Sequence, residues 1–561
     1  MNSRIFLSLL AATVFITKAP LAKAVTNEEL KIGVNQEFET LNPIIATTVA
    51  AKYMLYFAYR TLVYLDIDGQ WKTQMLKEIP SLQNKKAKII SKNGKKFLET
   101  KIEIIETAKW GDGTPVTCKD LKLTVDIGRN TNVSIANREA YTDIEDVVWD
   151  EKTPKKCVVT FNKLLWNFYQ NLPDVTPAHI EQAIFDKWGK EKEGYDRNTM
   201  YTKNPKLPGL YNGPYLISEV TLGSHLIYVP NPHFYGTKPK IKKIILRILP
   251  NTGTLEANLR SNTVDMIASI GMSFDQALIF DEKIKTEKLP YNVLFKSGTV
   301  YQHLDVNLDS PNLKDIRVRQ ALMYGLKKDD IMKSIFENKA TNAIHWITPD
   351  DAWFTDDPKF VVSYKFDKKK AKSLLDEAGW TVGKDGYRFK DGQKLTLKMA
   401  GAAGVKLIDN IQAILQSQWK DIGIEILLKN EPGRVLFSET IPKRRFDLAI
   451  FSWSSNPEQS PESTFHSKNI PTEKNSWSGQ NDTGWNNPKV DLNIEKLKEE
   501  FDPKKRKALI AEMIKAYTSE IPVIPLFFRP SNAVVPKNMK GFSLAGHQFY
   551  ESYHAEKWDL Q

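Results

Sequence analysis

The chain has 561 residues, of which 41% are hydrophobic and 26% are charged. This length leaves room for several domains with buried cores, and the composition excludes both a disordered tail and a membrane bundle. Two cysteines exclude a disulfide scaffold and a Cys-rich metal protein. The net charge of +12 comes from basic residues in short runs that lie far apart, which favours solvated faces over a nucleic-acid surface.

Residues 1–24 have the pattern of a secretory signal peptide. Arg4 supplies the positive start, residues 5–16 are mostly apolar but too short to span a bilayer, and residues 22–24 (AKA) fit a small-x-small cleavage site. No cysteine follows this site to carry a lipid anchor. We therefore expect a soluble mature chain that is exported to a periplasm.

Cys118 and Cys157 could pair in such an oxidising compartment. They are 39 positions apart, and a closed loop of that size would stabilise the fold by ~3–4 kcal/mol. Two buried free thiols are the alternative, and the sequence leaves both open.

The first third of the chain alternates short strands, a helix and turns. Apolar or alternating residues predict the strands, and clusters of Gly, Asp and Pro predict the turns. In chain order we expect a strand at 30–34, a helix near 48–59, a hairpin at 62–69, a strand at 102–105, a turn at 110–115 and a strand at 158–161.

The C-terminal half has clearer amphipathic helices. Asp367 is expected to cap a helix whose apolar residues between 371 and 378 recur at i, i+3, i+4 and i+7, and Gly379 is expected to end it. Helices alternating with strands predict layered α/β lobes. Similar signals predict a turn at 391–392, helices at 408–420 and 503–518, and strands at 424–428 and 446–451.

The sequence offers little reaction chemistry. It has no nucleophile elbow, no phosphate-binding loop and no dinucleotide-binding fingerprint. Its eight histidines are dispersed, with no H-x-x-x-H pair that would indicate a local zinc site. We therefore expect a protein that is not an enzyme and needs no cofactor or metal; the alternative is a secreted enzyme with scattered catalytic residues.

Short motifs along the chain resemble one family. Each motif is weak alone, but their order and spacing cover almost the whole mature chain. They are ETLNP at 39–43, WGDGTPVT at 110–117, NGPY at 212–215, NPHFYG at 231–236, DIRVRQAL at 315–322, AKSLLDEAGW at 371–380, FD at 446–447, Trp453, GWNNP at 484–488 and IPVIPL at 521–526. Together they resemble the family 5 extracellular solute-binding proteins, the oligopeptide and dipeptide receptors of ABC importers.

The resemblance implies an α/β fold of the large, type II periplasmic-binding-protein-like class, with two α/β lobes, a hinge and an extra domain. Strands near 300–307 and 521–528 would cross between the lobes, which would close over a ligand. By analogy, lobe I would combine residues 25–55, 205–300 and 525–561, residues 56–204 would form the extra domain II, and residues 301–524 would form lobe III.

The resemblance also implies a function. The protein would be a periplasmic, monomeric substrate-binding protein that captures a peptide or peptide-like solute and delivers it to the membrane permease of an ABC transporter. A receptor of the same fold for an oligosaccharide, a metal–chelator complex or a signal molecule is the alternative. By position, the ligand-binding residues would be Trp453, Ser454 and Asn456 on lobe III, and Thr47 and Val49 on lobe I.

One position departs from the family pattern. Peptide-binding members carry an Asp three residues beyond the Trp, and this carboxylate binds the α-ammonium of the peptide. The matching residue here is Asn456, whose amide accepts a hydrogen bond but cannot neutralise a buried charge. Recognition of a free N-terminus would then need another acid, for which Glu458 and Glu462 lie nearby. A plain turn at 456–457 is the structural alternative.

Overall fold

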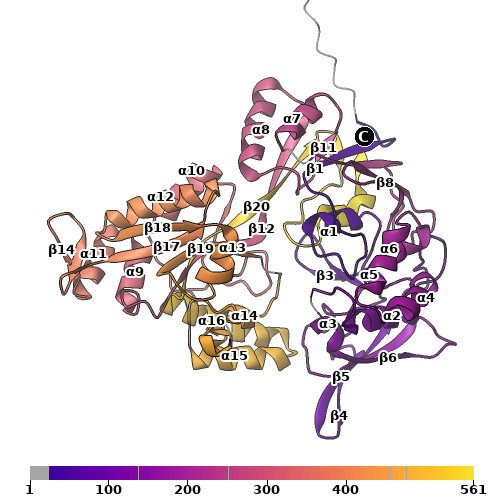
Figure 1. Cartoon of the computed structure of the whole chain (residues 1–561), viewed down its shortest axis with the longest axis horizontal. Coiled ribbons are helices and arrows are strands. Elements are labelled where there is room, and N and C mark those ends of the chain that lie inside the picture. The colour runs from indigo at the N-terminus through magenta and orange to yellow at the C-terminus, as the bar shows by residue number, and fades with distance from the viewer. Residues whose placement is uncertain (1–24, 137, 250–251, 455, 476) are drawn as a thin grey trace, which may run out of the picture.

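The structure is a computed structural model that describes residues 25–136, 138–249, 252–454, 456–475 and 477–561. The predicted signal peptide at 1–24 lies outside the described residues. Figure 1 shows two large bodies side by side, joined by long strands. None of the helices described is both long and apolar enough to cross a membrane.

A single mixed sheet runs through both bodies. It has 11 strands, and β13 (Thr341–Asn342) pairs with β20 outside the main path. The order along the path is β18 (Glu425–Glu431), β17 (Thr396–Ala402), β19 (Leu448–Ser454), β12 (Tyr291–Val306), β20 (Val523–Pro536), β11 (Met266–Ile267), β1 (Leu30–Val34), β10 (Ile244–Ile248), β9 (His225–Pro230) and β8 (Tyr215–Thr221).

Strands β12 and β20 connect the two bodies. They have 16 and 14 residues and pair antiparallel, with β20 also bonded to β11 on one side and β12 to β19 on the other. The register shifts between Ser297 and Val300, and again between Gln302 and His303. Such irregularities bend a strand pair locally.

Each body has its own apolar core, which is the usual sign of separate folding units. The core of the first body draws on residues 30–268 and 535–560. The second body, built from residues 301–528, has one core around Trp419 and another around Tyr517. A further small core packs α7 (Thr252–Arg260) and α8 (Phe274–Glu287) against β12 and β20.

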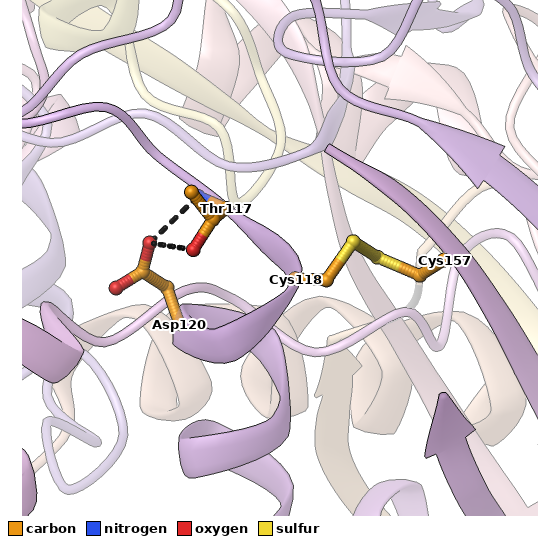
Figure 2. The surroundings of a disulfide bond; sticks show 4 residues. All are labelled: Thr117, Cys118, Asp120 and Cys157. Atoms are coloured by element: carbon orange, nitrogen blue, oxygen red, sulfur yellow. Dashed lines mark hydrogen bonds between the residues drawn. A yellow bond between two sulfur atoms is a disulfide. The ribbon is translucent and has the colours of Figure 1, made fainter. Parts of the chain in front are cut away.

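The first body contains a small antiparallel sheet in the order β4 (Ala87–Lys92), β5 (Lys95–Glu103), β7 (Lys156–Phe161), β6 (Ile144–Trp149). The structure joins Cys118, the first residue of α2 (Cys118–Arg129), to Cys157 on β7 in a disulfide (Figure 2). Beside it, Asp120 accepts hydrogen bonds from the backbone N–H and the hydroxyl of Thr117, as Figure 2 shows. The disulfide therefore holds the start of α2 against the sheet.

The other elements of the first body are short. They are α1 (Val49–Leu55), β2 (Val63–Leu65), β3 (Trp71–Thr73), α3 (Glu139–Thr142), α4 (Ala178–Trp188), α5 (Gly194–Asn198), α6 (Met200–Lys203), β21 (Met539–Lys540) and β22 (Asp559–Leu560). The predicted helix at 48–59 was too long. It ends at Leu55, where the N–H groups of Ala58 and Tyr59 both turn back to the Leu55 carbonyl at 2.8 Å.

The second body confirms the predicted helices. Asp367 caps α11 (Lys368–Glu377) by accepting from Lys370 N at 3.0 Å, and Gly379 follows with a φ of +86°. Its remaining elements are α9 (Ile316–Tyr324), α10 (Lys328–Phe336), β14 (Thr381–Val382), β15 (Arg388–Lys390), β16 (Gln393–Lys394), α12 (Lys406–Lys420), α13 (Gly433–Val435), α14 (Glu462–Phe465), α15 (Pro488–Glu499) and α16 (Pro503–Glu520).

Candidate functional site

A cavity of about 260 Å³ lies in the second body beside β12 and β19, and we call it the β12–β19 cavity. Loops after residues 345 and 454 complete its lining. Its walls are rich in aromatic side chains, which offer large apolar surfaces to a ligand. These aromatic residues are Tyr301, Trp346, Trp353, Trp453 and Phe465.

Strand β12 supplies the polar side of the cavity. Tyr301, His303 and Asp305 line it together because alternate residues of a strand share one face. The rings of His303 and Tyr301 stack with centroids 4.8 Å apart, and Phe451 meets His303 edge-on at 4.7 Å. The Tyr301 hydroxyl lies 2.7 Å from that of Tyr517. The face is therefore held rigidly before any ligand arrives.

Several polar atoms around the cavity have no hydrogen-bond partner within the described part of the chain. They are His303 Nε2, Trp346 Nε1 and Ser460 Oγ, and all three residues line this one cavity. Buried polar groups in folded proteins are nearly always hydrogen-bonded. A concentration of unsatisfied atoms around one cavity indicates a site that a ligand completes.

The cavity is also acidic. Asp305 and Asp351 line it, and no Lys or Arg does so among the residues the structure describes. Burial raises the pKa of Asp351, although its carboxylate accepts from the backbone N–H groups of Trp353 and Glu458, both at 2.8 Å. Asp482 lies near Asp305 outside the cavity lining, and burial, followed by the charge of Asp305, raises its pKa to about 8.

The sequence predictions for lobe III all fall on this cavity. Trp453 and Ser454 lie on β19, where Trp453 is paired with Tyr301 and Ser454 with Val300. The predicted strand at 446–451 was therefore too short, because pairing with β12 continues it to Ser454. Asn456 also lines the cavity, and its backbone N–H donates to Gln459 Oε1 at 2.8 Å.

The two positions predicted on lobe I lie elsewhere. Thr47 lines a second cavity, of about 460 Å³, in the first body. Glu39 accepts from the backbone N–H groups of Thr47 and Thr48 at 2.6 and 2.9 Å. Burial alone would raise the pKa of Glu39, but the hydrogen bonds from Thr48 and Thr47 lower it. Val49 is 45% exposed and lines neither cavity.

The bodies also touch away from the connecting strands. Trp166 of the first body lies with its ring 5.4 Å from that of Trp353 and 4.1 Å from the Arg506 guanidinium, and its backbone N–H donates to Lys498 O at 3.4 Å. Because Trp353 lines the β12–β19 cavity, this contact links the first body to the cavity wall.

His303 and Asp305 were absent from the residues predicted to bind a ligand. The strand at 300–307 was predicted, and the ionisable His303 and Asp305 at alternate positions of this strand were the signal in the sequence. Trp346 lies about 45 residues further along the chain, and only the folded structure brings it to the same cavity.

Known proteins resemble the chain over most of its length. The oligopeptide-binding protein AppA of Bacillus subtilis is 23% identical over 472 residues, which cover 82% of this chain and 80% of AppA. The oligopeptide-binding protein from Thermus thermophilus, solved in complex with a pentapeptide, matches with a TM-score of 0.67 at 24% identity, covering 95% of this chain and 96% of the other.

A third match shares the fold. NikZ from Campylobacter jejuni, solved in complex with Ni(L-His), has a TM-score of 0.69 at 23% identity and covers 95% of this chain and 100% of the other. The model of the bacterial extracellular solute-binding proteins, family 5, matches residues 91–476, which is more than half of the chain. That span includes the β12 and β19 residues that line the cavity. The chain therefore belongs to family 5 of the bacterial extracellular solute-binding proteins.

Proposed function

We propose that the protein is the substrate-binding component of an ABC importer, which captures a peptide or peptide-like solute in the periplasm and delivers it to a membrane permease. It acts as a monomer and does not convert its ligand. The observation that carries this proposal is the β12–β19 cavity, where aromatic walls surround unsatisfied polar atoms. AppA and the pentapeptide-bound protein from Thermus thermophilus support a peptide as ligand.

The ligand is enclosed by bending at the two connecting strands. Lobe I comprises 25–55, 205–300 and 525–561, domain II comprises 56–204, and lobe III comprises 301–524. The register shifts in the β12–β20 pair fall at the boundary between lobes I and III, and irregular pairing makes a strand pair easier to bend. Closure excludes water from the cavity, which strengthens every hydrogen bond and charge pair to the ligand.

Trp453, Ser454 and Asn456 contact the ligand from lobe III, and Thr47 and Val49 face it from lobe I. The first three share one cavity, which supports their assignment directly. Thr47 belongs to the cavity of the opposite body, so it would meet the ligand upon closure.

A non-peptide ligand is the second candidate. It is favoured by Asn456, which stands where peptide-binding relatives carry an acid, and by NikZ of the same fold, which was solved with Ni(L-His). Oligosaccharides, metal–chelator complexes and signal molecules belong to this class.

Thermal unfolding tests the proposal. The chain from Val25 onward, stripped of ligand by unfolding and refolding, is heated with and without a pool of peptides of two to five residues. Ligand at 100 times its Kd stabilises the folded state by about 2.7 kcal/mol, which produces a clear rise in Tm. A rise supports peptide capture. If peptides have no effect and oligosaccharide or metal–chelator pools raise Tm, the second candidate replaces the first.

A further inference from the structure

We propose that Asp305 binds a positively charged group of the ligand, so that the solute carries an ammonium or guanidinium group and places it in the β12–β19 cavity. This inference names the ligand class and rests on the proposed function. Asp305 would also replace the acid that peptide-binding members of the family carry at the position of Asn456.

Asp305 is buried beside the cavity. Its side chain is only 5% exposed, yet it lines the cavity. Within the described ranges no group donates a hydrogen bond to its carboxylate, and His303 Nε2, which lies 3.3 Å from Oδ1, does not form a hydrogen bond with it. A buried carboxylate without donors is costly unless a partner arrives to pair with it.

Asp305 carries the negative charge in this part of the molecule. Burial, followed by the charge of Asp305, raises the pKa of the neighbouring Asp482 to about 8, so Asp482 is largely protonated at pH 7, and its Oδ1 has no hydrogen-bond partner among the described residues. The nearby guanidinium of Arg444 is already engaged, since it pairs with Asp309 at 2.7 Å and donates to Asp482 O at 3.0 Å. No Lys or Arg among the described residues lines the cavity, so the charge of Asp305 is left for a cationic ligand to neutralise.

Aromatic side chains line the cavity around Asp305. Trp346, Trp453 and Tyr301 surround the same space as Asp305. The faces of aromatic rings attract cations, and this attraction grows when water is excluded. Aromatic faces combined with a buried carboxylate favour a cationic group over a neutral or anionic one of the same size.

Two sources could supply this cation: the α-ammonium of a peptide, or the side chain of a lysine or arginine within the ligand. Four probes separate them: trialanine, trialanine blocked at both ends, the same blocked peptide with a central lysine, and the non-peptide cation agmatine. Isothermal titration calorimetry at pH 7 measures the affinity of each probe for the stripped chain from Val25 onward.

The variant Asp305→Asn tests the residue. We expect the wild type to bind at least one cationic probe ten times or more tightly than the blocked trialanine, and we expect Asp305→Asn to abolish this preference. Because the substitution removes an unpaired buried charge, the Tm of the unliganded variant should equal or exceed that of the wild type, which shows that the variant is folded. Asp329→Asn, at an exposed position in the first turn of α10, is the matched control and should bind like the wild type.

The outcomes separate the two proposals. If blocked and cationic peptides bind equally well, or if Asp305→Asn keeps the preference, the role of Asp305 is wrong while peptide capture stands. If agmatine binds through Asp305 and no peptide binds, the role of Asp305 stands and peptide capture is wrong. If neither agmatine nor any cationic peptide binds, the role of Asp305 is overturned. Preference for trialanine assigns the cation to the N-terminus, and preference for the lysine peptide assigns it to a side chain.

Discussion

His345 and His547 are held as neutral rings by the same pair of hydrogen bonds. In each ring Nε2 donates to a backbone carbonyl at 2.8 Å. Nδ1 accepts at 3.2 Å from a backbone N–H two residues further on, that of Ile347 or Phe549. Burial is the main cause that lowers the pKa of both rings to about 4. A proton on Nδ1 would break the second hydrogen bond in each case.

These histidines predict acid sensitivity. Below pH 6.5 the unfolded chain takes up protons that the folded rings accept only near pH 4, so this contribution to stability is present above pH 6.5 and is lost as the pH falls to 4. The His547→Gln variant should show a shallower fall of Tm between pH 6.5 and 4 than the wild type. If scanning calorimetry shows the same fall of Tm with pH for the variant and the wild type, His547 does not cause the acid sensitivity.

Asp482 predicts the opposite pH dependence. Its folded pKa of about 8 lies above the ordinary value of 3.8, so the unfolded chain loses its proton first and stability falls as the pH rises between these values. Asp482→Asn removes this penalty, and we expect it to stabilise the fold by on the order of 5 kcal/mol at pH 8 and by little at pH 4. Urea denaturation at both pH values measures the difference; a variant that gains nothing at pH 8 would contradict it.

The substitution Asn456→Asp is expected to strengthen binding of peptides with a free N-terminus. Asn456 lines the β12–β19 cavity, so Asn456→Asp adds a carboxylate to a space that already contains Asp305. We expect trialanine to bind several times more tightly to the variant, with N-acetylated trialanine unaffected. Calorimetry with both peptides measures this, and an unchanged affinity for trialanine would remove Asn456 from the proposed binding residues.

The bridge between α2 and β7 predicts a redox-dependent stability. Cys118 and Cys157 enclose a loop of 39 positions, so we expect the Cys118→Ser/Cys157→Ser variant to lose ~3–4 kcal/mol of unfolding free energy. Guanidinium denaturation with and without reductant measures the loss. The double variant is its own control, because reductant should destabilise the wild type alone. A wild type that is indifferent to reductant would contradict the bridge.

Among the helices, strands and turns, the sequence predicted those features that depend only on residues close by in the chain. The Asp367 cap, the apolar stripe of α12 and the turn at Asp391 and Gly392 depend on neighbours in sequence, and all were predicted. The end of β19 and the length of β20 depend on pairing with β12, some 150 and 230 positions away, and both were misjudged.

The residues that line the cavity also differ in how far the sequence predicts them. Trp453 and Ser454 were predicted by resemblance to a known pattern, whereas Asp305 was not, because its significance comes from burial without a partner. Burial of that kind follows from tertiary packing of segments between residues 299 and 523. The sequence alone shows only that His303 and Asp305 stand at alternate positions of a predicted strand.

In the whole molecule, the Trp166 contact helps to hold the two bodies close to each other. Its ring packs on Trp353 and Arg506 of the second body. Trp166→Ala should weaken this contact, increase the radius of gyration in small-angle X-ray scattering and speed ligand release. Trp188→Ala, which removes a ring paired with Lys187 in the first body, is the control. An unchanged radius would show that the contact does not hold the bodies together.

The path of β12 and β20 has a consequence for how the chain is assembled. The chain leaves the first body along β12 and returns to it along β20. Trp558, which is fully buried, packs edge-on against Phe57 at 5.6 Å, and Asn27 bonds to Asp559 at 2.8 Å. The first body thus cannot complete its core until residues 555–560 have been synthesised, whereas residues 301–528 of the second body are continuous in sequence. During synthesis, the N-terminal part of the first body therefore lacks its final packing partners until almost the whole chain is made.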